Sequence, residues 1–187
     1  KIDKETRHNY LQKFGFGSVS PLRFEGESSG ILHDHKDWDK MTNYATTYGQ
    51  GISVTGIQMA YAYQAMANDG LRLDPILVEN CVSDDGTVLY QPKQNSTRVV
   101  SKETANLNIN LMEKVVEFGG VGQNAGIDGY RVAGKTGTAQ IKDGSGYGSQ
   151  FAISFYGLAP AENPKFVVGV TIYKAVGVSN SLQATFP

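Results

Sequence analysis

The sequence predicts an α/β (α+β) fold in which an antiparallel sheet is flanked by helices. Two long helical segments, at about residues 55–69 and 102–118, precede three apolar strands at about 130–141, 151–158 and 166–173. Strands that follow one another through short connections pair antiparallel, and their separation from the helices along the chain indicates a layered structure. The composition is that of a folded protein, with 40% hydrophobic and 19% charged residues.

The N-terminal quarter is predicted to be mostly irregular. A helix is expected to end near Gln12, before the breaking residues Gly15 and Gly17. From Ser18 to Tyr48 the sequence has no clear periodicity. Such a length is unusual for a connection inside a compact domain, and it predicts a functional or surface-wrapping segment.

Side chains able to bind a metal gather once in this segment, at His33, His35 and Asp37. No second cluster accompanies them, so solvated loop polarity is favoured over a metal site. Cys81 is the single cysteine, which excludes an intramolecular disulfide and a multi-cysteine metal site. We therefore expect neither a metal nor another cofactor.

The segment 55–69 has the stronger helix signals. Thr55 and Gln58 have the spacing of a capping box, in which each side chain satisfies a backbone N–H of the first turn. Gly70 stands where a left-handed C-terminal cap is favoured. Apolar residues surround the helix axis, which predicts burial on nearly every face. These residues are Ile57, Met59, Ala60, Tyr61, Tyr63, Ala65 and Met66.

The segment 102–118, which follows the cap residue Ser101, is predicted to lie on the surface of the core. Its apolar residues recur at i, i+4 and i+8, so one face is expected to pack inward. That stripe consists of Leu107, Leu111 and Val115, widened by Met112 and Val116.

Further strands are predicted on either side of this helix. Short strands at 71–79 and 86–91 are expected to meet at the turn Asp85-Gly86. Residues 143–149, rich in Gly and Ser, are expected to form a mobile loop between the first two strands of the main sheet.

The strand at 130–141 carries residues suited to acyl transfer. A site that handles a peptide with a free carboxylate needs a cation, hydroxyl donors and backbone N–H groups aimed at the developing oxyanion. Lys135 offers the positive field, Thr136 and Thr138 the hydroxyls, and Gly137 room for a substrate to approach the backbone. The tripeptide alone equally fits a plain strand in which Lys135 faces solvent and Gly137 forms a bulge.

The alternation of side chains along a strand separates these groups. Thr136, Thr138 and Gln140 fall on one face and Lys135 on the other. For Lys135 to act in the same cleft, either its stem curls round or the strand twists, and the sequence leaves both open.

Lys135-Thr136-Gly137 is one of three motifs of the serine acyltransferases that recognise penicillin, and its surroundings resemble the class B penicillin-binding proteins. The chain looks most similar to the septal, cell-division branch, and residues 1–187 look like the C-terminal portion of a single transpeptidase domain. The segments whose order and spacing match that family are 14–17, 26–30, 48–55, 67–70, 132–140, 154–160 and 163–165.

The resemblance implies a five-stranded antiparallel sheet flanked by helices, with a serine nucleophile at a helix start. That serine attacks a peptidoglycan stem peptide ending in D-Ala-D-Ala, an amine of a neighbouring stem resolves the acyl-enzyme, and β-lactams acylate the same serine. The resemblance also implies a protein anchored in the cell membrane, with its catalytic domain on the extracytoplasmic side. Membrane proteins of the division complex are the implied partners.

Site roles follow from the matching motif. Lys135 is expected to hold the electrostatic field and proton network, and the Thr136 and Thr138 hydroxyls to bind the carboxylate. The Thr138 backbone N–H is expected to form half of the oxyanion hole. Gly137 and Gln140 are expected beside the substrate.

Two family motifs are absent. Of the serines in these 187 residues, none is followed by Lys at the third position or by Asn at the second. In the family both motifs precede the counterpart of Phe14, so they are expected before Lys1. This polypeptide alone is therefore expected not to react with penicillin. It is also expected to leave apolar surface uncovered, through which copies can swap elements or associate.

Smaller departures lie elsewhere. Gly56 stands where the family commonly has proline, and Val121 where threonine is frequent. The tail at 179–187 matches poorly, so the closing helix is expected to be short or absent.

Composition excludes some functions and leaves others open. A net charge of −1 gives no reason to expect a nucleic acid partner, and no run approaches the roughly 20 apolar residues that span a bilayer. Two alternatives to a septal transpeptidase remain. One is a β-lactamase or β-lactam sensor of the same superfamily, and the other is a non-catalytic module that binds division proteins.

Overall fold

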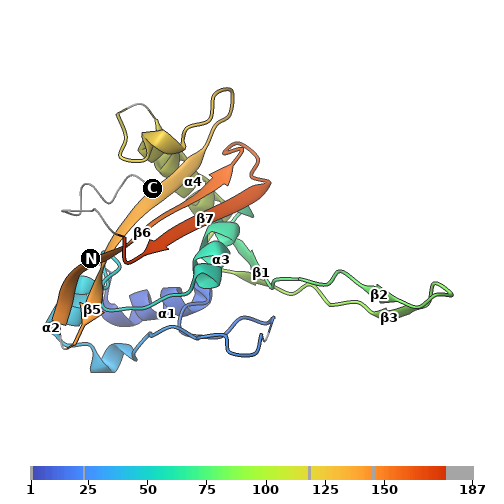
Figure 1. The fold of residues 1–187 in the computed structure, drawn as a ribbon, viewed down its shortest axis with the longest axis horizontal. Helices are drawn as coiled ribbons and strands as arrows, with labels where there is room; N and C mark the ends of the chain where they lie inside the picture. Colours follow the sequence, from blue (N-terminus) through green and yellow to red (C-terminus); the bar gives the residue numbers. More distant parts are fainter. Residues whose placement is uncertain (1, 23, 118, 145, 176–187) are drawn as a thin grey trace.

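A three-stranded antiparallel sheet forms the centre of the chain (Figure 1). Its strands are β5 (Ala133–Asp143), β6 (Gly146–Ala159) and β7 (Phe166–Tyr173), paired in the order β5-β6-β7. Helices beside an antiparallel sheet are the fold class that the sequence predicts. The structure is a computed structural model that describes residues 2–22, 24–117, 119–144 and 146–175.

The turn between β5 and β6 differs from the predicted mobile loop over 143–149. The ladder continues to the pair Asp143–Gly146, so both strands reach into the predicted loop. Gly144 adopts a φ of +59°, a conformation that glycine takes without steric penalty and that tight hairpin turns require. The glycines that indicated a loop therefore serve a hairpin.

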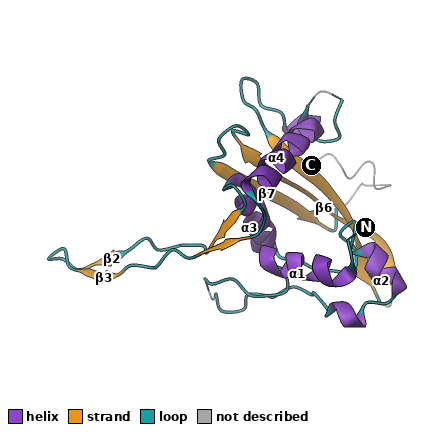
Figure 2. Cartoon of the chain, turned by 180° about the vertical axis from the view of Figure 1, so that it is seen from behind, coloured by secondary structure: helices purple, strands orange, loops and turns teal. Residues whose placement is uncertain are grey.

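Helices α3 (Gly56–Ala67) and α4 (Lys102–Val116) lie against the same face of the sheet (Figure 2). α3 contacts β6 and β7, and α4 contacts β5. The predicted capping box of α3 is present: Thr55 N–H donates to Oε1 of Gln58 at 2.9 Å, and Gln58 N–H donates to Oγ1 of Thr55 at 3.2 Å. The buried cluster between the helices and the sheet consists of Ile109, Met112, Ala133, Leu158 and Ala161.

The stripe that α4 buries matches the predicted one only in part, at Met112 and Val116. Leu107 and Leu111 are 61% and 60% exposed. The sequence offered two apolar stripes on opposite sides of one helix, and the stripe that begins with a small alanine allows the closer approach to the sheet. The residues that face the core are Ala105, Ile109, Met112 and Val116.

Helix α3 is less buried than predicted. Gln58 and Ala65 are its buried residues, and Ile57 is 37% exposed. The described elements cover one side of the helix and leave the rest half-buried. Gly70 follows with the expected positive φ of 81°, where a side chain would start 2.3 Å from the Val100 carbonyl oxygen. The residue that caps the helix is nevertheless Asn68.

The N-terminal part contains more helix than predicted. α1 (Lys4–Phe14) is capped by the Asp3 side chain and ends at Gly15, whose φ is +98°. The segment of residues 18–53, here called the strap, contains the short helices η1 (His35–Asp37) and α2 (Lys40–Ala45). These helices lack a periodic apolar stripe, so sequence periodicity could not reveal them.

The predicted hairpin over 71–91 is split into two ladders. β1 (Leu71–Leu73) pairs with β4 (Ser96–Arg98), and β2 (Cys81–Val82) pairs with β3 (Val88–Tyr90). Prolines interrupt the ladder between them, because proline lacks the N–H that a ladder needs. They are Pro75 and Pro92.

Uncovered apolar surface remains on the sheet, as the sequence predicts. Alternate residues of β7 present one apolar face, from Phe166 at 68% exposure to Ile172 at 42%. Val168 and Val170, between them, are 61% and 49% exposed. Within the described ranges, no helix combines the length and the apolar character needed to cross a membrane.

Candidate active site

The predicted tetrapeptide lies on β5, at one edge of the three-stranded sheet. Lys135 pairs with Tyr156, Gly137 with Ser154, and Thr138 with Ile153. In the part of the chain that the structure describes, no strand pairs with the other side of β5. Alternate backbone N–H and C=O groups of an edge strand point away from the sheet, where an extended peptide can bind them.

The Lys135 side chain curls round the strand. Its ammonium donates to the backbone oxygen of Thr136 at 2.9 Å and to the Thr136 hydroxyl oxygen at 3.3 Å. The stem thus carries the charge to a residue of opposite parity. Of the two geometries that the sequence left open, the structure has the first.

The three polar side chains on the other face become more exposed toward the hairpin turn. Thr136 is buried, Thr138 is half-buried and Gln140 is exposed. The Gln140 amide donates to the Gly148 carbonyl at 3.4 Å, across the hairpin. Lys135 is joined directly to Thr136, whereas Thr138 and Gln140 follow along the strand without a described bond to it.

Gly137 is required by close packing within the sheet. A β-carbon at this position would lie 2.5 Å from Oγ of Ser154 on the paired strand. Gly134 is similarly enclosed, because a β-carbon there would lie 2.3 Å from the Phe155 ring. Both glycines allow β5 to pack closely against the side chains of β6. The opposite edge of β5 has no paired strand among the described residues.

Paired with Lys135 in the sheet is Tyr156, which forms a tyrosine pair with Tyr63, a residue predicted to pack in the core. Tyr156 is buried, and its ring lies 5.6 Å from that of Tyr63 on α3. Burial raises the pKa of Tyr63 to about 12, so its phenol stays neutral at ordinary pH. Gly56 lies close by, where a β-carbon would be 3.3 Å from the Tyr156 hydroxyl. The pair packs α3 against β6.

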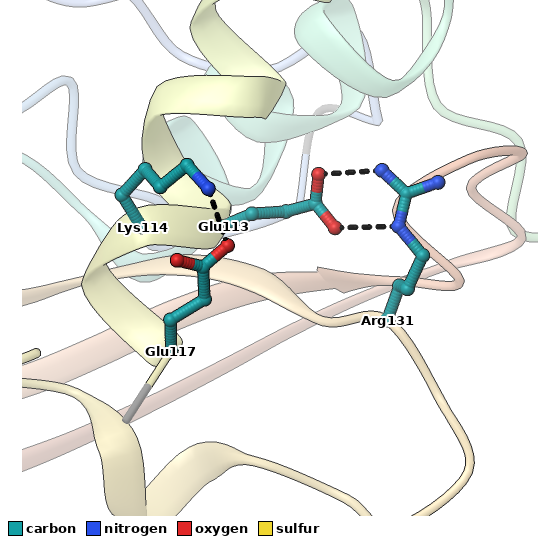
Figure 3. Close-up of polar contacts among 4 residues, drawn as sticks. All are labelled: Glu113, Lys114, Glu117 and Arg131. Atoms are coloured by element: carbon teal, nitrogen blue, oxygen red, sulfur yellow. Dashed lines mark hydrogen bonds and ion pairs between the residues drawn. The ribbon is translucent and has the colours of Figure 1, made fainter. Parts of the chain in front are cut away.

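An ion pair anchors the chain where it enters β5 (Figure 3). Arg131 donates from Nε and Nη2 to the two carboxylate oxygens of Glu113 on α4, at 2.8 and 2.7 Å. These bonds raise the pKa of Arg131 further. Its carbonyl accepts from Ala161 N–H at 2.8 Å. A two-point guanidinium–carboxylate pair fixes direction as well as distance. It therefore holds the residues just before β5 against α4.

A second ion pair on α4 lies beside the first. Lys114 contacts Glu117 at 2.6 Å, one turn further along the helix. Both side chains are largely exposed, and such pairs contribute little to stability. No sequence signal distinguished Glu113 from these neighbours, because its partner comes from another element.

The trio His33, His35 and Asp37 does not converge. His33 and Asp37 are exposed, while His35 packs against the buried His8, with ring centroids 5.4 Å apart. The prediction of solvated polarity is therefore wrong for His35, because α1 covers it. Among the described residues, no group of three or more His, Cys, Asp or Glu side chains is placed to hold a metal.

The wall on β5 combines an exposed Lys135, a half-buried Thr138 and a buried Thr136. Two cavities of the described chain lie elsewhere: one of about 250 Å³ between Gly15, Tyr61 and Arg72, and one of about 690 Å³ beside the β2–β3 hairpin. A cation, two hydroxyls and free backbone groups along an edge strand can bind an anionic peptide end. A cleft around them requires a second wall.

An edge strand of this composition, on an antiparallel sheet backed by helices, defines the class of the penicillin-recognising acyltransferases. The family model of the penicillin binding protein transpeptidase domain matches residues 1–184, and the chain belongs to this family. That match includes part of the tail over 179–187, which was predicted to match poorly. The structure of this tail lies outside the described residues.

Relatives agree with this assignment. The chain is 37% identical over 179 residues to penicillin-binding protein PbpB of Mycolicibacterium smegmatis, which covers 91% of this chain and 28% of that protein. It is 31% identical over 173 residues to the probable peptidoglycan D,D-transpeptidase PenA of Neisseria gonorrhoeae, covering 92% and 28%. The chain thus spans little more than a quarter of the length of these relatives.

A solved structure supports the fold. Penicillin-binding protein 3 of Mycobacterium tuberculosis, complexed with ampicillin, superimposes with a TM-score of 0.85 at 36% identity. The superposition covers 97% of this chain and 44% of that one. The transpeptidase fold is therefore present in part.

Proposed function

We propose that the protein to which this chain belongs is a peptidoglycan D,D-transpeptidase that acts in septal cell-wall synthesis. A serine outside these 187 residues attacks the carbonyl of the penultimate D-Ala of a stem peptide. The bond to the terminal D-Ala breaks, and that residue leaves with a proton on its nitrogen. An amine of a neighbouring stem then attacks the acyl-enzyme and releases the serine. The observation that carries this proposal is the Lys135–Thr138 wall on an open sheet edge in a chain of this family.

Each residue of the wall has a role in the proposal. The Thr136 and Thr138 hydroxyls donate to the terminal carboxylate, and the Lys135 ammonium provides the positive field that attracts it. The Thr138 N–H donates to the oxyanion while the tetrahedral intermediate exists. Gly137 and Gln140 border the substrate. The lysine's bond to Thr136 supports this arrangement, because it brings the charge to the threonine face.

The acyl-enzyme is tested by labelling. A fluorescent penicillin is mixed with the whole protein and, separately, with this 187-residue chain, and the products are weighed by mass spectrometry. We expect one stable adduct on the whole protein and none on the chain alone, since no serine here has Lys at the third following position. A stoichiometric adduct on the chain contradicts the placement of the nucleophile, and an unlabelled whole protein contradicts the function itself. Rapid hydrolysis of a chromogenic cephalosporin by the whole protein indicates the β-lactamase alternative instead.

The carboxylate-binding role is tested with Thr138→Val, which removes the hydroxyl and keeps the shape. We expect penicillin acylation of the whole protein to slow by about 10- to 100-fold, the loss typical of a hydrogen bond to a charged group. Thr97→Val, on the exposed strand β4, is the matched control and should leave the rate unchanged. An equal rate for both variants shows that Thr138 does not hold the carboxylate.

The cellular setting belongs to the same proposal. We propose that the whole protein is anchored in the cell membrane, exposes this domain on the extracytoplasmic side and works beside membrane proteins of the division complex. A fluorescent fusion should gather at division sites, and its depletion should yield cells that elongate without dividing. Uniform labelling of the cell periphery, with normal division after depletion, contradicts the septal role.

A further inference from the structure

The β2–β3 hairpin lies apart from the main sheet and its helices. Residues 75–92, here called the arm, project from the body beyond β1 and β4 (Figure 1). The ladder of the arm consists of the pairs Cys81–Tyr90 and Val82–Val88, with a register shift between them. A two-stranded hairpin of this kind is only marginally stable in water.

The arm exposes apolar side chains along its whole length. Leu77 near its base is 67% exposed, and Leu89 on β3 is 68% exposed. Its other exposed apolar residues are Ile76, Val78, Val82, Val88 and Tyr90. Contiguous apolar surface on a projecting element is typical of a contact site.

The outer edge of β3 carries neither charge nor proline, two of the features by which natural edge strands block a further strand. The segment 87–91 contains neither. Leu89 falls at the register shift, where β3 has one residue more than β2. A bulge of this kind opposes pairing locally, so a further strand would have to pair with the backbone groups of β3 beside Leu89.

The negative charge of the arm favours a partner strand with basic side chains. Between Pro75 and Pro92 there are three acidic residues, Glu79, Asp84 and Asp85, and no basic residue, so the arm has a net charge of −3. At its base, a groove of about 690 Å³ runs between the arm and the strap. Its apolar lining includes Leu22, Phe24, Ile76 and Tyr90.

We propose that the arm is a docking site for an extended segment of a partner protein, which adds to β3 as a third strand. The partner segment carries Lys or Arg side chains opposite the acidic residues, and it places an apolar side chain in the groove. Strand addition of this kind obtains affinity from main-chain hydrogen bonds and specificity from side chains. An anionic membrane surface is disfavoured because the arm is itself negative. The inference concerns a surface away from β5, so it stands or falls independently of the proposed transpeptidase activity.

The test measures peptide binding to the whole protein by fluorescence anisotropy. The probes are two labelled nine-residue peptides, one of alternating Val and Lys and one of alternating Val and Glu. We expect the lysine peptide to bind at least about tenfold more tightly, and its affinity to fall as salt rises. Leu89→Lys and Glu79→Lys should each weaken that binding about tenfold, because they place a positive charge on the docking surface.

Matched controls separate the arm from general surface effects. Leu111→Lys changes a leucine of similar exposure on α4, and Asp128→Lys changes an exposed acid after η2 (Gln123–Ala125). Both should bind the lysine peptide as the unmodified protein does. Equal affinity for the two peptides, or no effect of Leu89→Lys, overturns the proposal.

Two further outcomes assign the surface to another occupant, and each also overturns the proposal. If sedimentation reveals a dimer that Leu89→Lys dissociates, the arm pairs with a second copy. If hydrogen exchange reveals strong protection of β3 in the free whole protein, another part of the same protein covers it.

Discussion

At the scale of single residues, Gln58 shows how one polar side chain can organise a long irregular segment. Its amide nitrogen donates to the Ser18 carbonyl at 2.9 Å and to the Ser29 carbonyl at 2.8 Å. Its amide oxygen accepts from Thr55 N–H. Gln58 is 1% exposed, so its amide depends on these protein partners for its hydrogen bonds. Gln58 thereby joins the strap to the start of α3.

Replacing this residue should loosen the strap. We expect Gln58→Ala to lower the free energy of unfolding of the whole protein by about 2–4 kcal/mol, since it removes two hydrogen bonds to strap carbonyls and half of the capping box. Gln64→Ala, on the same helix but half-buried, is the control and should have the smaller effect. Urea denaturation measures both. An equal loss for the two variants contradicts this role.

Tyr63 makes a prediction about alkaline pH. Its pKa is raised to about 12 by burial, whereas in an unfolded chain it ionises near 10. A raised pKa means that the contribution to stability is complete below pH 10 and is lost as the pH rises from 10 to 12. The loss amounts to about 2–3 kcal/mol, at about 1.4 kcal/mol per pH unit.

The measurement compares unfolding free energies at pH 9 and near pH 12. Tyr63→Phe should lose less stability over this range than the unmodified protein, because phenylalanine cannot ionise. Tyr90→Phe, which alters a tyrosine that is 53% exposed, should lose as much as the unmodified protein. Identical pH profiles for Tyr63→Phe and the unmodified protein show that ionisation of Tyr63 does not cause the loss of stability.

At the scale of elements, β5 is held by its fit to β6 and by the anchor between Arg131 and Glu113. The fit depends on the absence of a side chain at Gly137, opposite Ser154. The anchor depends on α4 presenting Glu113 toward the segment before β5. The anchor lies outside the Lys135–Thr138 wall, whereas Gly137 belongs to it. Together they place the Lys135–Thr138 wall at the sheet edge.

A double-mutant cycle tests the fit. Gly137→Ala should lower the melting temperature of the whole protein, because the new β-carbon meets the Ser154 hydroxyl at 2.5 Å. Adding Ser154→Ala removes that oxygen and should restore most of the loss, since residues in contact are not additive. A double variant that is as unstable as the sum of the two single variants excludes the contact as the cause.

At the scale of the whole molecule, the described chain leaves apolar surface exposed to solvent. The outer face of β7, from Phe166 to Ile172, and the leucines of α4 lie in solvent. The relatives are more than three times as long, and the superimposed structure extends beyond this chain. We infer that sequence outside these residues covers part of this surface and supplies the second wall of the cleft.

This inference predicts different behaviour for the short chain and the whole protein. The 187-residue chain should bind an apolar fluorescent dye strongly and sediment as a mixture of associated species. The whole protein should do neither at the same concentration. Val170→Lys, on the outer face of β7, should reduce association of the short chain, whereas Thr97→Lys on β4 should not. If the short chain is monodisperse and does not bind the dye, the outer face of β7 is stable in solvent and the inference is wrong.

Some features of the fold could be predicted because they depend on neighbours in sequence. The capping box at Thr55 and Gln58, the turn at Asp85-Gly86 and the strand over Phe166–Tyr173 arise from local hydrogen bonding and alternation. The stripe of α4 was predicted correctly at Met112 and Val116 and wrongly at Leu107 and Leu111, because both sides of the helix carry apolar residues. Periodicity identifies an amphipathic helix, but the partner decides which stripe is buried.

For the candidate site, too, some features follow from the sequence and others only from the structure. The sequence by itself determined the family and predicts the chemistry of the site, because Lys135, Thr136, Gly137 and Thr138 are consecutive and their context matches one family. Only the tertiary structure decided how the lysine charge reaches the threonine face, that β5 lies at a sheet edge, and that Ser154, Tyr156 and Arg131 support it. Apart from the bond between the adjacent Lys135 and Thr136, these contacts join residues that are more than ten positions apart in the chain. Their formation depends on packing between elements, which local sequence patterns do not encode.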